Sequence, residues 1–128
     1  MLEKGIKGKL ESIVTKENTA KAMGSGELEV YATPAMIALM EETAYKSVAS
    51  ELEAGSGSVG TFMNVKHVAA SPVGIKIPCQ SELENVEGRK LTFKVEAYDE
   101  TGLIGEGIHE RFIIVNNKFQ EKADSKLG

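Results

Sequence analysis

Two polar residues stand where the sequence pattern calls for apolar ones. Glu41 precedes Tyr45 by four residues and Val48 by seven, so it falls inside the apolar stripe of an expected helix. His67 shares one face of an expected strand with Met63, and this face points toward the same interior. A carboxylate and an imidazole directed into one interior form a candidate acid–base pair, in which the carboxylate acts as a general base or a nucleophile.

Each of these two residues also has a plain structural interpretation. Glu41 can lie at the edge of a wide apolar stripe, with its carboxylate in water, because a buried carboxylate is costly unless it is paired. His67 can be a hydrogen-bonded core histidine, which is the commoner role of a single histidine on an apolar face. The pattern alone leaves both interpretations open.

Thr33 is the third candidate, at the expected start of the helix. Thr33-Pro34 is typical of a helix N-terminus, with Thr33 as the N-cap and Pro34 in the first turn. A catalytic hydroxyl at that position would lie where developing negative charge is stabilised. Because a helix rises 1.5 Å per residue, Thr33 and Glu41 should lie about 12 Å apart. A site that uses both must therefore be elongated or combine residues from two chains.

Gly60 and Arg111 are candidates for contact with a substrate. Gly60 lies in the segment GSVGT, which lacks the Gly-Lys-Ser/Thr of a Walker loop. A glycine here lets a backbone N–H approach a ligand closely, or it marks a strand-entry turn or a bulge. Arg111 shares a strand face with His109 and can bind a carboxylate or phosphate; alternatively, it forms a salt bridge on the open face of the sheet. Cys79 has no partner motif and is predicted to be a structural thiol.

The elements that position these residues are one long helix and several strands. The helix is expected from residue 33 to about residue 52, with an exposed Glu42–Lys46 ion pair. Its apolar face is predicted to hold Ile37, Ala44, Tyr45, Val48 and Leu52, widened by Met36 and Met40. Strands are expected at 8–15, 58–70, 75–84, 89–98 and 103–116, with a short extended segment at 28–32. One face of the second of these strands is expected to hold Val59, Thr61, Met63, Val65, His67 and Ala69.

The four strands after the helix predict an antiparallel meander that wraps around the helix and buries its apolar face. The fold class is therefore α+β. The polar tail after Phe119 is predicted to be frayed.

Composition excludes several classes of protein. The chain has 128 residues, of which 41% are hydrophobic and 27% charged, and it is predicted to form a single domain over residues 1–128. A net charge of −4 and 5% aromatic residues argue against nucleic-acid binding. Two histidines and one cysteine argue against a metal site and a disulfide framework. No apolar stretch approaches the roughly 20 residues of a membrane span and no signal peptide is visible, so a cytoplasmic location is expected.

Several motifs in order resemble the fluoroacetyl-CoA thioesterase-like family of the hot-dog superfamily. They are YAT at 31–33, LME at 39–41, GSGSVGT at 55–61, HVAASP at 67–72, VEGR at 86–89 and GIHER at 107–111. The resemblance implies a hot-dog fold, in which an antiparallel sheet wraps around one long helix. It also implies a homodimer with sites between the subunits.

The resemblance places the family's catalytic Thr, Glu and His on Thr33, Glu41 and His67, and its substrate-contacting Gly and Arg on Gly60 and Arg111. The specialised fluoroacetyl enzyme has a longer, aromatic-rich segment before the threonine. Here that stretch is the short Met23–Val30, without phenylalanine. A different short or medium acyl group is therefore as plausible a substrate as fluoroacetyl.

These residues and the resemblance together predict an acyl-CoA thioesterase that needs no metal and no cofactor beyond the coenzyme A of its substrate. Its expected partner is a small-molecule acyl-CoA. A non-catalytic acyl-CoA or small-acyl binding module is the alternative, since it would keep the pocket without turnover. A hot-dog hydratase is disfavoured, because the Asp and His about five residues apart that it would need before the helix are absent.

Overall fold

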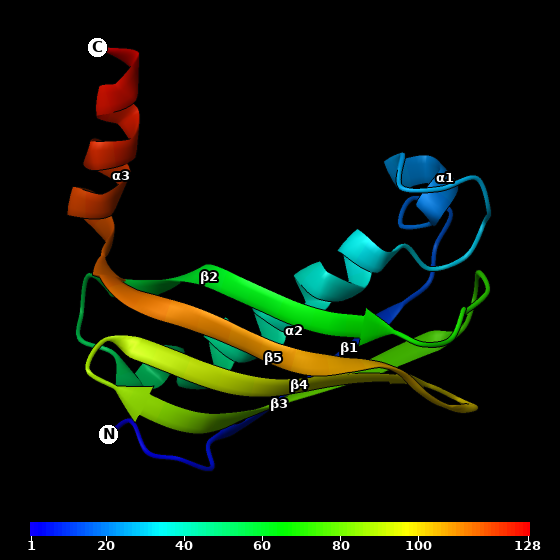
Figure 1. Cartoon of the computed structure of the whole chain (residues 1–128), viewed down its shortest axis with the longest axis horizontal. Coiled ribbons are helices and arrows are strands. Elements are labelled where there is room, and N and C mark those ends of the chain that lie inside the picture. The colour runs from blue at the N-terminus through cyan, green and yellow to red at the C-terminus, as the bar shows by residue number, and fades with distance from the viewer.

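The computed structural model describes residues 1–128 and contains a five-stranded antiparallel sheet that curves around one long helix (Figure 1). The expected α+β class is confirmed. The strands are β1 (Lys7–Ile13), β2 (Ser56–His67), β3 (Lys76–Glu87), β4 (Lys90–Asp99) and β5 (Gly102–Val115).

The order of the strands differs from the expected meander. The sheet runs β1-β3-β4-β5-β2, so only β3, β4 and β5 form a meander. The strand after the helix, β2, pairs with β5 and not with its sequence neighbour β3. The expectation of a four-stranded meander was therefore wrong, because short loops report which strands follow each other but not which strands pair. One consequence is that β2 is an edge strand with an unpaired side.

Helix α2 (Thr33–Val48) lies behind the sheet in Figure 1. Its N-cap is Ala32, which has an extended backbone at φ −73° and ψ 139°. The assignment of Thr33 as N-cap was wrong, because Thr33 is already helical and its side chain makes no capping bond. The helix ends at Val48 and a single 3-10 turn (Ala49–Glu51) follows it, so the expected end near Leu52 is also corrected.

The core side of α2 is shifted relative to the predicted face. The helix buries Met36, Leu39, Met40, Thr43, Ala44 and Val48. Tyr45 is instead 41% exposed, because α2 packs mainly against β3 and β1, which draws Leu39 and Thr43 inward. Close packing on β1 depends on Gly8, where an added Cβ would lie 2.7 Å from the backbone oxygen of Thr43. The expected Glu42–Lys46 ion pair is present at 2.6 Å.

Strand β2 contains a β-bulge near its middle. Gly60 lies opposite Arg111 and Phe62 lies opposite Glu110, so Thr61 is an extra residue in the ladder. The alternation of faces therefore changes at the bulge. The expectation that Val59 and Thr61 share the face of His67 was wrong for this reason.

The two ends of the chain complete the fold. A short helix α1 (Ala20–Met23) is followed by the expected extended segment at 28–32, which pairs with the rest of the chain only at two isolated bridges, Thr19–Tyr31 and Val30–Pro72. Helix α3 (Asn116–Asp124) and a final 3-10 turn (Ser125–Leu127) replace the expected frayed tail. In Figure 1, α3 rises from the end of β5 and stands away from the sheet. None of the helices is both long enough and apolar enough to cross a membrane.

Candidate active site

Thr33 and His67 meet where the start of α2 lies beside the end of β2. The Oγ1 of Thr33 is hydrogen-bonded to Nδ1 of His67 at 2.8 Å. The other ring nitrogen of His67, Nε2, is buried and has no hydrogen-bond partner in the chain. Burial lowers the pKa of His67, so the neutral imidazole is favoured. The pair therefore presents a neutral imidazole with one nitrogen oriented by a hydroxyl and the other free for a ligand.

A cavity of about 280 Å³ adjoins this pair. Its lining residues come from α1, the loop before α2 and the segment after β2, and they are mostly small: Ala20, Ser25, Val30, Tyr31, Thr33, His67, Val68, Ala69 and Ala70. A small apolar group bound here would touch both Thr33 and His67.

Glu41 lies farther along α2, beside Arg111 and Gly60. Its side chain is 42% exposed, and its Oε2 is 3.9 Å from Nη1 of Arg111. Glu41 thus lies at the edge of the stripe, not in the core. A Cβ added at Gly60 would come within 2.6 Å of the Glu41 carboxylate. Gly60 therefore leaves open the space directly in front of that carboxylate.

Arg111 is held in one position by three neighbours. Its Nε donates to Oγ of Ser58 at 2.8 Å, and its Nη2 donates to the backbone oxygen of Ser58 at 2.8 Å. The guanidinium carbon lies 5.5 Å from the centre of the Tyr45 ring, a cation–π arrangement. The third neighbour is His109, whose Nε2 lies 3.0 Å from Nη1 of Arg111. Sequence reasoning missed Ser58, although its position two residues before Gly60 on one strand face could have indicated it.

Arg111 and His109 are 6% and 1% exposed, so the interpretation of an open-face salt bridge was wrong. Both side chains point toward the helix, because they lie on the buried face of β5. His109 bonds through Nδ1 to the backbone oxygen of Phe62 at 2.9 Å and stacks against Phe93. Burial lowers the pKa of His109, with a smaller contribution from the Arg111 charge.

Within one chain the five predicted site residues form two groups. Thr33 and His67 make one group, and Glu41, Gly60 and Arg111 make the other. Eight residues of α2 separate Thr33 from Glu41, a rise of about 12 Å. Along β2, Gly60 and His67 are separated by about 20 Å at 3.3 Å per residue. No single-chain arrangement in the structure joins the two groups.

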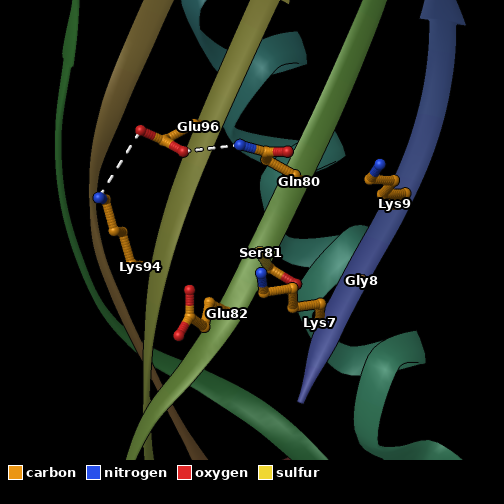
Figure 2. Close-up of a pocket in the computed structure, with 8 residues that line it drawn as sticks. All are labelled: Lys7, Gly8, Lys9, Gln80, Ser81, Glu82, Lys94 and Glu96. Atoms are coloured by element: carbon orange, nitrogen blue, oxygen red, sulfur yellow. Dashed lines mark hydrogen bonds and ion pairs between the residues drawn. The ribbon is translucent and has the colours of Figure 1, made fainter. Parts of the chain in front are cut away.

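Other parts of the molecule lack this kind of chemistry. A polar cleft of about 80 Å³ crosses β1, β3 and β4 on the side of the sheet away from α2, and no apolar side chain lines it (Figure 2). Inside it, Gln80 donates to Glu96 at 2.8 Å and Lys94 lies 3.8 Å from the same carboxylate. Cys79 is buried, and burial raises the pKa of its thiol, as expected of a packing residue. No group of three or more His, Cys, Asp or Glu side chains is arranged to hold a metal ion.

Comparisons with known proteins identify the class of this fold. A thioesterase superfamily member from Thermus thermophilus has a TM-score of 0.89 at 30% identity, over 98% of this chain and 93% of that one. A variant of fluoroacetyl-CoA thioesterase, solved with acetyl-CoA, has a TM-score of 0.94 at 34% identity, over 99% and 100% of the two chains. The fold is therefore that of a hot-dog thioesterase.

The sequence comparisons narrow the class to one family. The fluoroacetyl-CoA thioesterase of Streptantibioticus cattleyicolor is 44% identical over 98 residues, which cover 77% of this chain and 70% of that protein. The model of the fluoroacetyl-CoA-specific thioesterase family matches residues 14–117. The chain belongs to this family of thioesterases, as its motifs predicted.

Proposed function

We propose that this thioesterase hydrolyses a short or medium acyl-CoA to the free acid and coenzyme A, with no metal ion and no further cofactor. The observation that carries the proposal is the Thr33–His67 bond beside a cavity of about 280 Å³, large enough for a small acyl group. The family relative solved with acetyl-CoA supports a short acyl thioester as the substrate. The enzyme would work in the cytoplasm.

Glu41 and His67 carry the bond-breaking steps in this proposal. The Glu41 carboxylate removes a proton from water that attacks the thioester carbonyl, or it attacks that carbon itself, and water then hydrolyses the resulting anhydride. In both routes the carbon–sulfur bond breaks and coenzyme A leaves as a thiolate. In the first route Glu41 passes the proton that it removed from water to His67; in the second route His67 takes the proton directly from the water that hydrolyses the anhydride. In both routes His67 then gives this proton to the sulfur of the departing thiolate. The lowered pKa of His67 keeps the imidazole in the form that accepts a proton.

Gly60, Thr33 and Arg111 bind and orient the substrate. The backbone N–H of Gly60 donates to the thioester oxygen and stabilises the oxyanion that forms there. The Thr33 hydroxyl orients the nucleophile or hydrogen-bonds the acyl group. Arg111 contacts the substrate, and its Nη1 lies 3.9 Å from Oε2 of Glu41.

The functional unit in this proposal is a homodimer, since two separated groups of residues must act on one thioester. Strand β2 has an unpaired edge, and pairing of two β2 strands in antiparallel fashion would cover it. A two-fold axis between Met63 and Asn64 would set Gly60 of one copy opposite His67 of the other. The Thr33–His67 group of each copy would then approach the Glu41 group of its partner.

The cavity fits several small acyl groups. The loop over the cavity, Met23–Val30, contains no phenylalanine, and the cavity is lined mostly by small side chains. Such a cavity selects by size more than by polar contacts, and one methylene changes binding by only about 1–3 kcal/mol. Fluoroacetyl, acetyl and slightly longer acyl groups are therefore all candidates.

The decisive experiment measures thiol release from a panel of acyl-CoA esters of increasing chain length, including polar and halogenated acyl groups. We expect turnover of at least one short ester, and loss of most of it in Glu41→Gln and His67→Ala. Glu42→Gln is the matched control, since Glu42 is the next residue and pairs with Lys46 on the solvent side. Saturable binding of an acyl-CoA without any thiol release would show a binding module in place of the enzyme.

A further inference from the structure

Asp99 places a carboxylate on the otherwise apolar buried face of β4. It is the last residue of that strand and only 8% exposed, and the residues before it on the same face are Leu91, Phe93, Val95 and Ala97. No ion pair of the chain includes Asp99. Because a buried carboxylate is costly unless it is paired or hydrogen-bonded, hydroxyl and amide groups must take the place of a cation here.

Both carboxylate oxygens of Asp99 accept short hydrogen bonds. Oδ1 accepts from the backbone N and from Oγ1 of Thr101, at 2.8 and 2.7 Å, inside the turn between β4 and β5. Oδ2 accepts from Oγ of Ser71 at 2.7 Å, and Ser71 is completely buried. The hydroxyls of Ser71 and Thr101 lower the pKa of Asp99, so the carboxylate is ionised at neutral pH. The bond to Ser71 is the long-range one, since 28 residues separate the two.

Ser71 ends the first of two chain segments that line the cavity beside the Thr33–His67 pair. The three residues between His67 and Ser71 all line this cavity: Val68, Ala69 and Ala70. The start of the segment is fixed to β5, because the backbone N–H of Val68 donates to the backbone oxygen of Ile104 at 2.7 Å. The bond to Asp99 fixes its far end.

Ser71 also holds the second segment that lines the cavity. Its backbone oxygen accepts from the backbone N–H of Tyr31 at 2.9 Å, and the neighbouring residues Val30 and Pro72 form an isolated bridge. Tyr31 lines the cavity where the chain leads into α2. Asp99 itself does not line the cavity, so it reaches both segments through Ser71.

We propose that Asp99 is a positioning residue of this thioesterase: through Ser71 it holds together the segments that carry Thr33 and His67, and so sets the width of the acyl cavity. The proposal rests on the proposed function, since it takes the Thr33–His67 pair as part of the active site. Without the bond to Asp99, the segment after His67 would move away from Tyr31. The cavity would widen, and water would reach the imidazole.

Four variants test this role. Ser71→Ala removes the bond between the carboxylate and the cavity segments, whereas Ser71→Thr keeps the hydroxyl. Thr101→Ala is the matched control, because it also removes one hydroxyl that donates to Asp99 at 2.7 Å, but one that belongs to the turn. Asp99→Asn keeps the shape of the side chain and removes its charge, so it weakens the bond to Ser71 without deleting an atom from the core. Urea denaturation establishes the stability of each variant.

The first measurement is an NMR titration of the two histidine rings, which needs no substrate. Burial lowers the pKa of His67, so entry of water should raise that pKa toward its ordinary value of about 6.5. His109 is the internal reference, because it is buried on β5 four residues from the position opposite His67. We expect a rise for His67 alone, large in Ser71→Ala, smaller in Asp99→Asn, and absent in Ser71→Thr and Thr101→Ala.

The second measurement is kcat and KM over the panel of acyl-CoA esters. In Ser71→Ala we expect kcat for the best short ester to fall about tenfold, because the catalytic pair is misplaced. Discrimination against longer acyl groups should weaken at the same time. Ser71→Thr and Thr101→Ala should keep the wild-type chain-length profile.

An unchanged pKa of His67 in both Ser71→Ala and Asp99→Asn overturns the proposal. An equal loss of stability in Ser71→Ala and Thr101→Ala, with the wild-type chain-length profile in both, overturns it as well, because Asp99 would then only stabilise the fold. If the wild type hydrolyses no acyl-CoA, the proposed function fails. The titration of His67 still decides in that case whether Asp99 positions the segment that follows this histidine.

Discussion

Arg111 donates a hydrogen bond from Nη1 to Nε2 of His109 over 3.0 Å, inside a part of the sheet where His109 is almost fully buried. An arginine has only donors, so Nε2 must carry a lone pair and no proton. The proton of the ring is then on Nδ1, which donates to the backbone oxygen of Phe62 at 2.9 Å. The two contacts fix His109 as a neutral ring in a single tautomer, and His109 in turn fixes the arginine that lies beside Glu41.

Replacing His109 by phenylalanine tests this relationship, because the substitution keeps a ring against Phe93 and removes the acceptor for Arg111. We expect thioester hydrolysis to fall about tenfold. An unsatisfied buried donor should also cost about 1–3 kcal/mol of unfolding free energy. Activity assays and urea denaturation measure the two effects. Ser58→Ala, which removes another acceptor of Arg111, should weaken activity in the same direction, and normal activity in both variants would contradict a positioning role.

The same histidine predicts a pH dependence of stability. The folded state lowers the pKa of His109, so between the folded and unfolded pKa values the unfolded chain binds more protons. The contribution of His109 is therefore complete above its ordinary value of about 6.5 and is lost as the pH falls toward the lower folded value. Urea unfolding at pH 7.5 and pH 5 should show a larger loss in the wild type than in His109→Phe. An equal loss in both proteins would assign the acid sensitivity to other groups.

Gly60→Ala should remove most of the activity while leaving the fold intact. The new methyl group would press on the Glu41 carboxylate and on the ring of His109, and Glu41, being half exposed, can move away. Its carboxylate would then be out of position for attack, which we expect to cost about a hundredfold in kcat. Gly57→Ala on the same strand is the control, because its methyl would meet only the flexible amide of exposed Asn116. Equal activity of the two variants would argue against a role for the space at Gly60.

Thr33→Val and Thr33→Ser separate the hydroxyl from the shape of the side chain. Serine keeps the bond to Nδ1 of His67 and should stay within a few-fold of wild-type activity, whereas valine should lose about tenfold to a hundredfold. Because burial lowers the pKa of His67 and only the neutral ring accepts a proton, activity of the wild type should persist through the ordinary histidine pKa of about 6.5 and fall at a lower pH. Rates measured from pH 4.5 to pH 8 check both points. A valine variant as active as the serine variant would remove Thr33 from the mechanism.

Mixing two inactive variants tests whether the site is shared between subunits. Suppose that each site takes Glu41 from one subunit and His67 from the other. In a mixed dimer of Glu41→Gln and His67→Ala, one site then carries both substitutions and the other carries neither. Random mixing should therefore restore about a quarter of wild-type activity. If each site is complete within one chain, every mixed dimer stays inactive. Sedimentation measurements establish the oligomeric state in parallel.

The sequence predicted the long helix and the five strands better than how they would be arranged. Glu41 and His67 drew attention because a charged or polar group interrupts a periodic apolar pattern, and their catalytic roles stay predictions. The pairing of β2 with β5 could not be predicted, since it depends on contacts between segments far apart in the chain. The role of Tyr45 was missed for a related reason: the helical pattern identifies an apolar face, but not which part of it touches the sheet and which part touches Arg111.

The bulge at Thr61 determines more than the local shape of β2. Gly60 and His67 are an odd number of residues apart, so on a regular strand they would point to opposite sides of the sheet. The extra residue restores agreement: Gly60 faces Arg111, His67 faces Gly105, and both partners lie on the helix side of β5. The bulge thus reverses which face of β2 the odd-numbered residues occupy. Deleting Thr61, or inserting one residue between it and His67, would turn one group of site residues outward while leaving every side chain of that group unaltered.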